Sequence, residues 1–190
     1  MSVDVTLNDR FVDLVNEGYD VAIRITALRD SSLIARRIAP SEGWICAAPQ
    51  YLDRHGRPET PADLAHHPCL IYAYGRSTRE WRLTGPEGDE HRVPVQGRFQ
   101  ANNGELLVEA AAAGSGLVLT PDFIAHRAVD EGRLERVLTA YRTPELAVHA
   151  IYPYTHHVSA KVRAFIDFLA ECFGGAPPPW AWERIAPNGR

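Results

Sequence analysis

The chain has 190 residues, of which 45% are hydrophobic and 23% are charged, and its formal net charge is −4. This balance is typical of a folded globular protein and excludes disorder over most of the length. A net acidic chain does not fit a DNA-binding surface, and no apolar run reaches the roughly 18 residues that a membrane span needs. We therefore expect this chain to contact neither DNA nor a membrane.

The three cysteines, Cys46, Cys69 and Cys172, stand far apart and without CxxC spacing. This pattern argues against a disulfide framework and against a zinc site, so we predict no metal site. The first residues have neither the basic stretch nor the apolar stretch of a signal peptide. Together these features indicate a reducing, cytoplasmic compartment.

Hydrophobic periodicity and turn signals predict alternating strands and helices along the chain. The first strand covers residues 3–7, where Val3, Val5 and Leu7 alternate with polar residues, and a helix ending at Gly18 follows it. Further strands are expected over residues 20–25, 33–40, 44–49, 69–72, 81–84, 91–99, 116–121, 134–138 and 146–152. Further helices are expected over residues 51–55, 61–66, 102–113, 122–131 and 159–173. This alternation indicates an α/β fold, and the proline-rich residues 175–190 are expected to form a disordered tail.

No familiar catalytic motif is present in the sequence: GxGxxG, GxxxxGK[ST] and HExxH are all missing. The segment around Ser115 resembles a nucleophile elbow only in part, because Ala113 and Leu117 occupy the outer glycine positions. Its order is also helix to strand, the reverse of an elbow. We therefore predict no catalytic residue, no cofactor and no enzyme activity.

Polar residues stand at the carboxyl ends of three predicted strands: Asn8, Thr26 and Thr120. Ligands of open α/β sheets bind at that edge. Asn8 and the pair Asn102-Asn103 also mark predicted helix N-termini, with Asn102 as the expected cap, where free N–H groups attract an anion. A small carboxylate could be held there without any catalytic group. Helix capping alone is the simpler interpretation of these asparagines, and the two are compatible.

A series of segments, in order and with matching spacing, resembles the LysR-type transcriptional regulators. The series begins at residues 11–25, FVDLVNEGYDVAIRI, and ends at residues 161–169, KVRAFIDFL. Between them lie residues 31–37, 48–58, 60–64, 101–105, 113–117 and 121–123. No single segment is specific, but the ordered set is, and it covers about residues 3–173.

The resemblance implies the effector-binding domain of such a regulator, with a two-lobed, type 2 periplasmic-binding-protein-like fold. Lobe I would comprise residues 1–47 and 154–174, and lobe II residues 48–153. A small effector, such as a carboxylate or an aromatic acid, would bind in the cleft and modulate transcription in the full-length protein. By position, the resemblance assigns the effector to Asn8 and Thr26 of lobe I and to Asn102, Asn103 and Thr120 of lobe II.

Family members carry a winged helix-turn-helix before this domain, and a first strand and helix of lobe I, which have no counterpart here. The sheet of lobe I is therefore expected to lack a central strand. Either residues 3–7 pair directly with residues 20–25, or two strand edges remain unpaired and open to another chain.

Two other functions stay open on the sequence. A solute-binding protein of an uptake system shares the implied fold, although the absent signal peptide and strand count against it. An enzyme is the third alternative, but no convergent set of residues supports it. For partners we expect a small-molecule effector, and either a homo-oligomer or pairing with full-length homologues.

Overall fold

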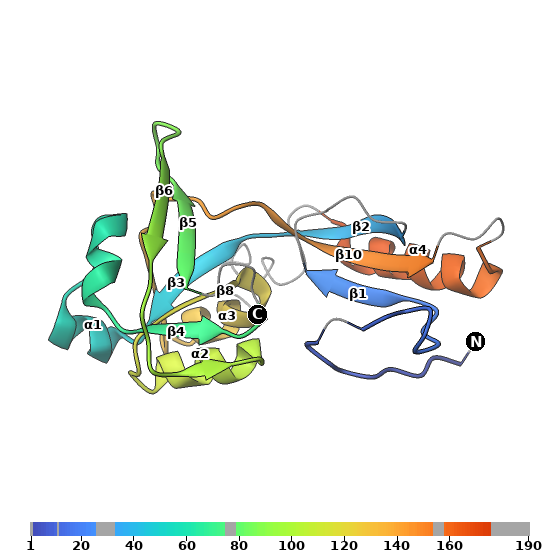
Figure 1. The fold of residues 1–190 in the computed structure, drawn as a ribbon, viewed down its shortest axis with the longest axis horizontal. Helices are drawn as coiled ribbons and strands as arrows, with labels where there is room; N and C mark the ends of the chain where they lie inside the picture. Colours follow the sequence, from blue (N-terminus) through green and yellow to red (C-terminus); the bar gives the residue numbers. More distant parts are fainter. Residues whose placement is uncertain (1, 11, 26–32, 75–78, 154–157, 176–190) are drawn as a thin grey trace, which may run out of the picture. The chain divides into compact units, whose positions relative to one another are not determined.

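The computed structural model of the chain describes residues 2–10, 12–25, 33–74, 79–153 and 158–175. The chain divides into two compact units. Unit 1 comprises Met1–Ser41 and Leu146–Arg190, and unit 2 comprises Glu42–Glu145. Strands and helices occur in both units, as the sequence predicts (Figure 1).

Unit 1 contains a three-stranded antiparallel sheet. Its middle strand is β10 (Leu146–Pro153), which pairs with β1 (Ala22–Ile25) on one side and with β2 (Leu33–Ser41) on the other. The register shifts between Val148 and His149, where β10 pairs with β2. In the described part of unit 1, β1 is therefore an edge strand.

Helix α4 (Ala160–Phe173) packs against this sheet (Figure 1). It begins after Ser159, whose hydroxyl accepts a hydrogen bond from a backbone N–H of the first turn at 3.3 Å. In the sequence, large apolar side chains recur every 3.6 residues along this helix, and this spacing predicts its apolar face. Ile166 is only 2% exposed and packs against Ile38 and Ala150, which form the small core of unit 1.

The strand predicted over residues 3–7 is wrong, because these residues have no regular structure and their apolar side chains are exposed. The helix predicted after them is also wrong, and residues 14–18 form a turn instead. The carboxylate of Asp13 accepts from the N–H groups of Val15 and Asn16, and that of Glu17 accepts from the N–H of Asp13. Such side-chain bonds compete with the backbone bonds of a helix.

Unit 2 contains a mixed five-stranded sheet with the order β7-β4-β8-β3-β9. Its two central neighbours β4 (Cys69–Tyr72) and β8 (Leu117–Pro121) run parallel, and β7 (Gln100–Ala101) runs parallel to β4. The strand β3 (Gly43–Ala47) is antiparallel to β8 and to β9 (Glu135–Val137).

One face of this sheet is covered by α1 (Pro49–His55), the 3-10 helix η1 (Pro61–His66) and a two-stranded hairpin of β5 (Glu80–Thr84) and β6 (Glu90–Pro94). These elements share one hydrophobic cluster with the sheet, which includes Leu52, Leu64, Trp81, Leu83 and Leu117. Thr60 and Asp63 form a capping box at the start of η1, which explains why the short predicted helix appears there.

The other face is covered by α2 (Gly104–Ala112) and α3 (Asp122–Asp130). Their buried small and apolar residues form a second cluster with Trp44, Cys46, Leu70 and Val118. Successive residues of β3 belong alternately to the two clusters, as expected for a strand that is covered on both faces. This second face is the one on which helix N-termini and strand ends come together.

The predicted lobe boundaries, 47/48 and 153/154, differ from the limits of the two units at 41/42 and 145/146. Strand pairing explains the difference, because β3 pairs within unit 2 whereas β10 pairs within unit 1. Except for Gly175, the predicted tail lies outside the described residues. Of the helices in the described ranges, none combines the length and the apolar character of a membrane span.

Candidate functional site

The carboxyl ends of β4, β7 and β8 meet at one edge of the unit 2 sheet, because β4 runs parallel to both of its neighbours. Asn102 and Asn103 directly follow β7, and Thr120 lies near the end of β8. Three of the five residues predicted to bind an effector therefore stand at this edge of one unit.

The N-terminus of α2 opens at this edge. Asn103 is its N-cap, and its side-chain oxygen accepts from the N–H of Leu106 at 2.8 Å. The cap predicted at Asn102 is thus one residue too early, which leaves the Asn102 side chain exposed and outside the capping turn. The N–H groups of Gly104 and Glu105 occupy the first two helical positions, where an α-helix offers no partner. With the helix dipole, they favour an anion.

Thr120 adds a buried hydroxyl beside these amides. The residue is 4% exposed, and its Oγ1 has no hydrogen-bond partner among the described residues. A Cβ placed on Gly104 would lie 4.0 Å from this oxygen and 2.8 Å from Ile124 Cδ1, so the missing side chain at position 104 lets α2 approach β8. Since an unsatisfied buried hydroxyl costs about 1–3 kcal/mol, a bound partner for Thr120 would remove this cost.

Two tyrosines stand at the same edge, a feature that the sequence analysis missed. Tyr72 is the last residue of β4 and pairs with Ala101 of β7, and Tyr74 follows two residues later. Their rings meet edge to face with centroids 6.2 Å apart, and Tyr74 is 41% exposed. They give the site an aromatic surface next to the polar groups. A run of aromatic residues at the end of a predicted strand is the signal that could have found them.

Both acidic residues and an arginine lie near this edge, where the Arg136 guanidinium stands 4.1 Å from the centroid of the Trp44 ring. Asp122 is 7% exposed, and its carboxylate accepts from the N–H of Glu42 at 3.3 Å. The side chain of Glu42 accepts in turn from the indole N–H of Trp44, the residue that pairs with Thr120 across the sheet. The α2 amides and the Thr120 hydroxyl can attract an anion at this edge, which suits a ligand with a single negative charge.

The remaining two predicted residues belong to unit 1. Asn8 is exposed, and its side-chain oxygen accepts from the N–H of Arg10 at 3.0 Å. This is a local turn and not the helix cap that the sequence predicts. Thr26 lies outside the described residues. Contact of Asn8 and Thr26 with an effector stays a prediction.

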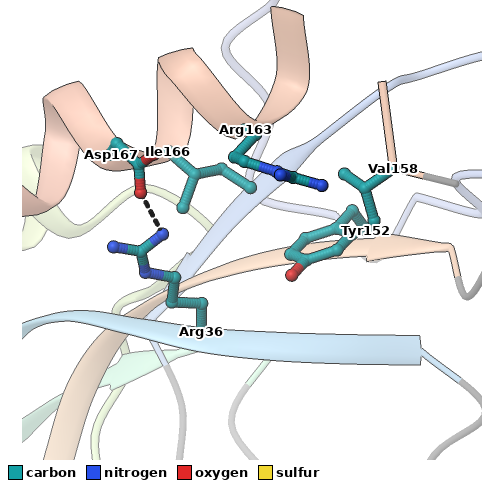
Figure 2. A pocket seen from close by; sticks show the side chains of 6 residues that line it. All are labelled: Arg36, Tyr152, Val158, Arg163, Ile166 and Asp167. Carbon is teal, nitrogen blue, oxygen red and sulfur yellow. Dashed lines mark hydrogen bonds and ion pairs between the residues drawn. The ribbon is translucent and has the colours of Figure 1, made fainter. Parts of the chain in front are cut away.

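Unit 1 has a cavity of about 280 Å³ between β2, β10 and α4 (Figure 2). The Arg36 guanidinium forms an ion pair with Asp167 across it, and the Arg163 side chain extends toward Tyr152 and Val158 (Figure 2). None of the predicted site residues lines this cavity.

The described residues contain no group of three or more metal-binding side chains. Cys69 is fully buried, and burial raises the pKa of its thiol to about 12, so it is no nucleophile. Burial likewise raises the pKa of Tyr51 to about 12, and its hydroxyl lies 2.9 Å from Nδ1 of His67. These buried groups hold the core of unit 2 together, and the α2 edge is left as the candidate binding site.

A family model described as "LysR substrate binding domain" matches residues 1–173. The chain belongs to the LysR substrate-binding domain family. This confirms the family and the periplasmic-binding-protein-like α/β fold that the sequence resemblance implies.

Relatives of known name are transcriptional regulators. Over 173 residues, the chain is 36% identical to the HTH-type transcriptional activator AaeR of Escherichia coli, covering 91% of this chain and 56% of that protein. Over 162 residues, it is 36% identical to an uncharacterized HTH-type transcriptional regulator of Haemophilus influenzae, covering 85% of this chain and 56% of that protein. The chain thus spans about half the length of the curated relatives it matches.

Solved structures agree with these relatives. The full-length virulence activator AphB of Vibrio cholerae is similar with a TM-score of 0.75 at 30% identity, covering 88% of this chain and 57% of that chain. The CrgA regulatory domain of Neisseria meningitidis is similar with a TM-score of 0.71 at 30% identity, covering 83% of this chain and 76% of that chain. These relatives favour a regulator over a solute-binding protein of an uptake system.

Proposed function

We propose that this chain senses a small monoanion for a transcriptional regulator and binds it at the α2 edge of unit 2. The observation that carries the proposal is the Thr120 hydroxyl, buried and without a partner among the described residues, beside the first amides of α2. Recognition there requires only hydrogen bonds and packing. Binding modulates transcription in the full-length protein, and no covalent step is involved.

The ligand is a carboxylate, and the two tyrosines at the edge favour an aromatic acid. Its carboxylate accepts from the N–H groups of Gly104 and Glu105 and from the Thr120 hydroxyl. We expect the exposed amide of Asn102 to donate to the same group, while Asn103 acts through the cap that orients the helix end. Tyr74 packs against the apolar part of the ligand.

The relatives also support proposals on DNA contact, location and chemistry. Those named above are HTH-type regulators, and the CrgA structure shows a regulatory domain. We infer that DNA is bound by a segment other than residues 1–173, that the protein works in the cytoplasm, and that it is not an enzyme. The supporting fact is the consistent naming of the relatives as transcriptional regulators.

The test is ligand-induced stabilisation of the 190-residue chain by benzoate, compared with butyrate. A ligand at 100 times its Kd should raise the unfolding free energy by about 2.7 kcal/mol. Thr120→Val removes one hydroxyl and keeps the shape, so it should abolish most of the benzoate shift without lowering the stability of the free protein. Asn102→Ala should weaken the shift in the same way, because Asn102 is not the cap.

Two controls separate binding from folding. Ser115→Ala changes an exposed hydroxyl at the far end of α2 and should leave the benzoate shift unchanged. Asn103→Ala should lower the stability of the free protein by about 1 kcal/mol through loss of the cap. If Thr120→Val and Asn102→Ala both keep the full benzoate shift, the ligand binds elsewhere and the proposed site is wrong.

A further inference from the structure

The cavity of unit 1 combines two arginines with an apolar wall (Figure 2). We propose that it is a second binding site, which takes a small carboxylate with an apolar body. All of its lining residues belong to unit 1, whereas the α2 edge belongs to unit 2. The site is therefore independent of the one proposed at the α2 edge.

The cavity lies on the side of the sheet where β2 is the outer strand. In the sheet order, β10 stands between β2 and β1, so α4 and β2 enclose the cavity on the side away from β1. Its lining residues come from β2, from β10 and from α4 with the residue just before its cap: Arg36, Tyr152, Val158, Arg163, Ile166 and Asp167. The cavity is thus built by elements that already pack together within unit 1.

One of the two arginines is already paired. Arg36 forms an ion pair with Asp167, which lies one helical turn after Arg163 on α4. Among the described residues, none accepts a hydrogen bond from the Arg163 guanidinium or forms an ion pair with it. Two arginines and one aspartate leave the lining with a net charge of one positive unit. A single carboxylate balances this charge, and its two oxygens match the paired N–H groups of a guanidinium.

The rest of the lining favours an organic acid over an inorganic anion. In Figure 2 the Tyr152 ring lies between the two arginines, and Val158 stands beside Arg163. Ile166, which is 2% exposed, connects this wall with the core of unit 1. These groups would cover the apolar body of a ligand, whereas sulfate or phosphate would leave them in water.

The size of the cavity limits the ligand. Its volume of about 280 Å³ lies just below the range of about 300–1,000 Å³ that is typical of sites for drug-sized molecules. A small aromatic acid such as phenylacetate has the single charge and the flat apolar body that this lining requires.

Calorimetric titration with phenylacetate tests the site. The protein is the 190-residue chain with Thr120→Val, so that binding at the α2 edge is suppressed. In this background, Arg163→Gln removes the guanidinium and should weaken phenylacetate binding about tenfold or more. The matched control, Lys161→Gln, removes an equal charge from the same helix outside the cavity and should change the Kd by less than about twofold.

A second variant tests the ion pair. Asp167→Asn keeps the shape of the side chain and releases Arg36, so phenylacetate should bind about threefold to tenfold more tightly. Its control, Glu171→Gln, changes the total charge equally outside the cavity and should leave the Kd within about twofold. All four substituted side chains on α4 belong to exposed residues, so the fold should stay intact in each variant.

Methyl NMR locates the bound probe. Phenylacetate should shift the methyl signals of Ile166 and leave those of Leu117, in the core of unit 2, unchanged. Equal binding by Arg163→Gln and Lys161→Gln, no tighter binding by Asp167→Asn, or a shift at Leu117 alone would each overturn the proposal. Phenylacetate binding that is present in wild type and lost with Thr120→Val would assign the probe to the α2 edge, which overturns the second site and leaves the proposed function standing.

Discussion

His149 is a buried histidine on the middle strand of unit 1, with only 3% of its surface exposed. Its Nδ1 has no hydrogen-bond partner among the described residues. Burial is the main cause that lowers the pKa of this side chain below its ordinary value of 6.5. A hydrogen bond with the backbone of Ala147 raises the pKa, and the charge of Arg37 lowers it, so that the net shift is downward. The ring is therefore neutral in the folded protein at neutral pH.

We expect His149→Leu to make the stability of unit 1 less sensitive to acid. The folded-state pKa lies below the unfolded value, so the contribution of neutral His149 is complete above about pH 6.5. It is lost as the pH falls through the folded-state pKa, with a slope approaching about 1.4 kcal/mol per pH unit. Urea unfolding from pH 7.5 to 5 should show wild type losing stability faster than the variant.

Comparing the pH dependence of stability between wild type and His149→Leu isolates the contribution of His149. The pKa of His67 in unit 2 is also lowered by burial, but His67 is present in both proteins and cancels in the difference. Curves that stay parallel through this pH range would show that His149 does not become charged on unfolding.

At the scale of elements, the loop after β6 packs directly on β4. The carbonyl of Gln96 accepts from the N–H of Cys69 at 2.7 Å, and a Cβ on Gly97 would lie 1.6 Å from the carbonyl oxygen of Cys69. We expect Gly97→Ala to lower the unfolding free energy of unit 2 by more than about 3 kcal/mol, because backbone must move. Gly132→Ala, with φ +70° and open space, should cost about 1–2 kcal/mol.

Urea denaturation followed by circular dichroism measures both variants. Equal losses in the two proteins would mean that the loop moves away without cost. The positive φ of Gly132 is a property of one residue, whereas the contact at Gly97 exists only because two elements are packed together.

At the same scale, sequence signals succeeded where their cause is local. The capping box of Thr60 and Asp63 and the turn into α4 at Ser159 each depend on a few neighbouring residues, and both helices are present. The alternating residues 3–7 carry an equally clear strand pattern, but a strand needs a partner with which to form hydrogen bonds. Unit 1 does not supply one within the described residues, so the same pattern gives no strand.

At the scale of the whole molecule, the two units differ in the size of their cores. The main buried cluster of unit 1 consists of Ile38, Ala150 and Ile166, whereas unit 2 has two larger clusters on the two faces of its sheet. Because stability grows with buried apolar area, we expect unit 1 to unfold at lower urea than unit 2. Hydrogen exchange at increasing urea should show protection lost first in β1, β10 and α4.

The Ile166→Ala variant tests whether the transition at lower urea is the unfolding of unit 1. It should destabilise unit 1 by about 2–4 kcal/mol and leave the exchange of β3 and β8 unchanged. Phe168→Ala, on the exposed side of the same helix, is the control and should change neither transition by more than about 0.5 kcal/mol. Loss of protection in one cooperative step across both units would contradict this expectation.

The sequence by itself determined the family, the α/β class and the helices that begin at local caps, because these depend on residue order and on neighbours along the chain. It also selected Asn102, Asn103 and Thr120, since strand ends and helix starts can be read from patterns. Only the tertiary structure decided that Asn103 and not Asn102 is the cap, that Thr120 is buried without a described partner, and that tyrosines share the edge. Burial and pairing are relations between distant segments, so packing alone decides them.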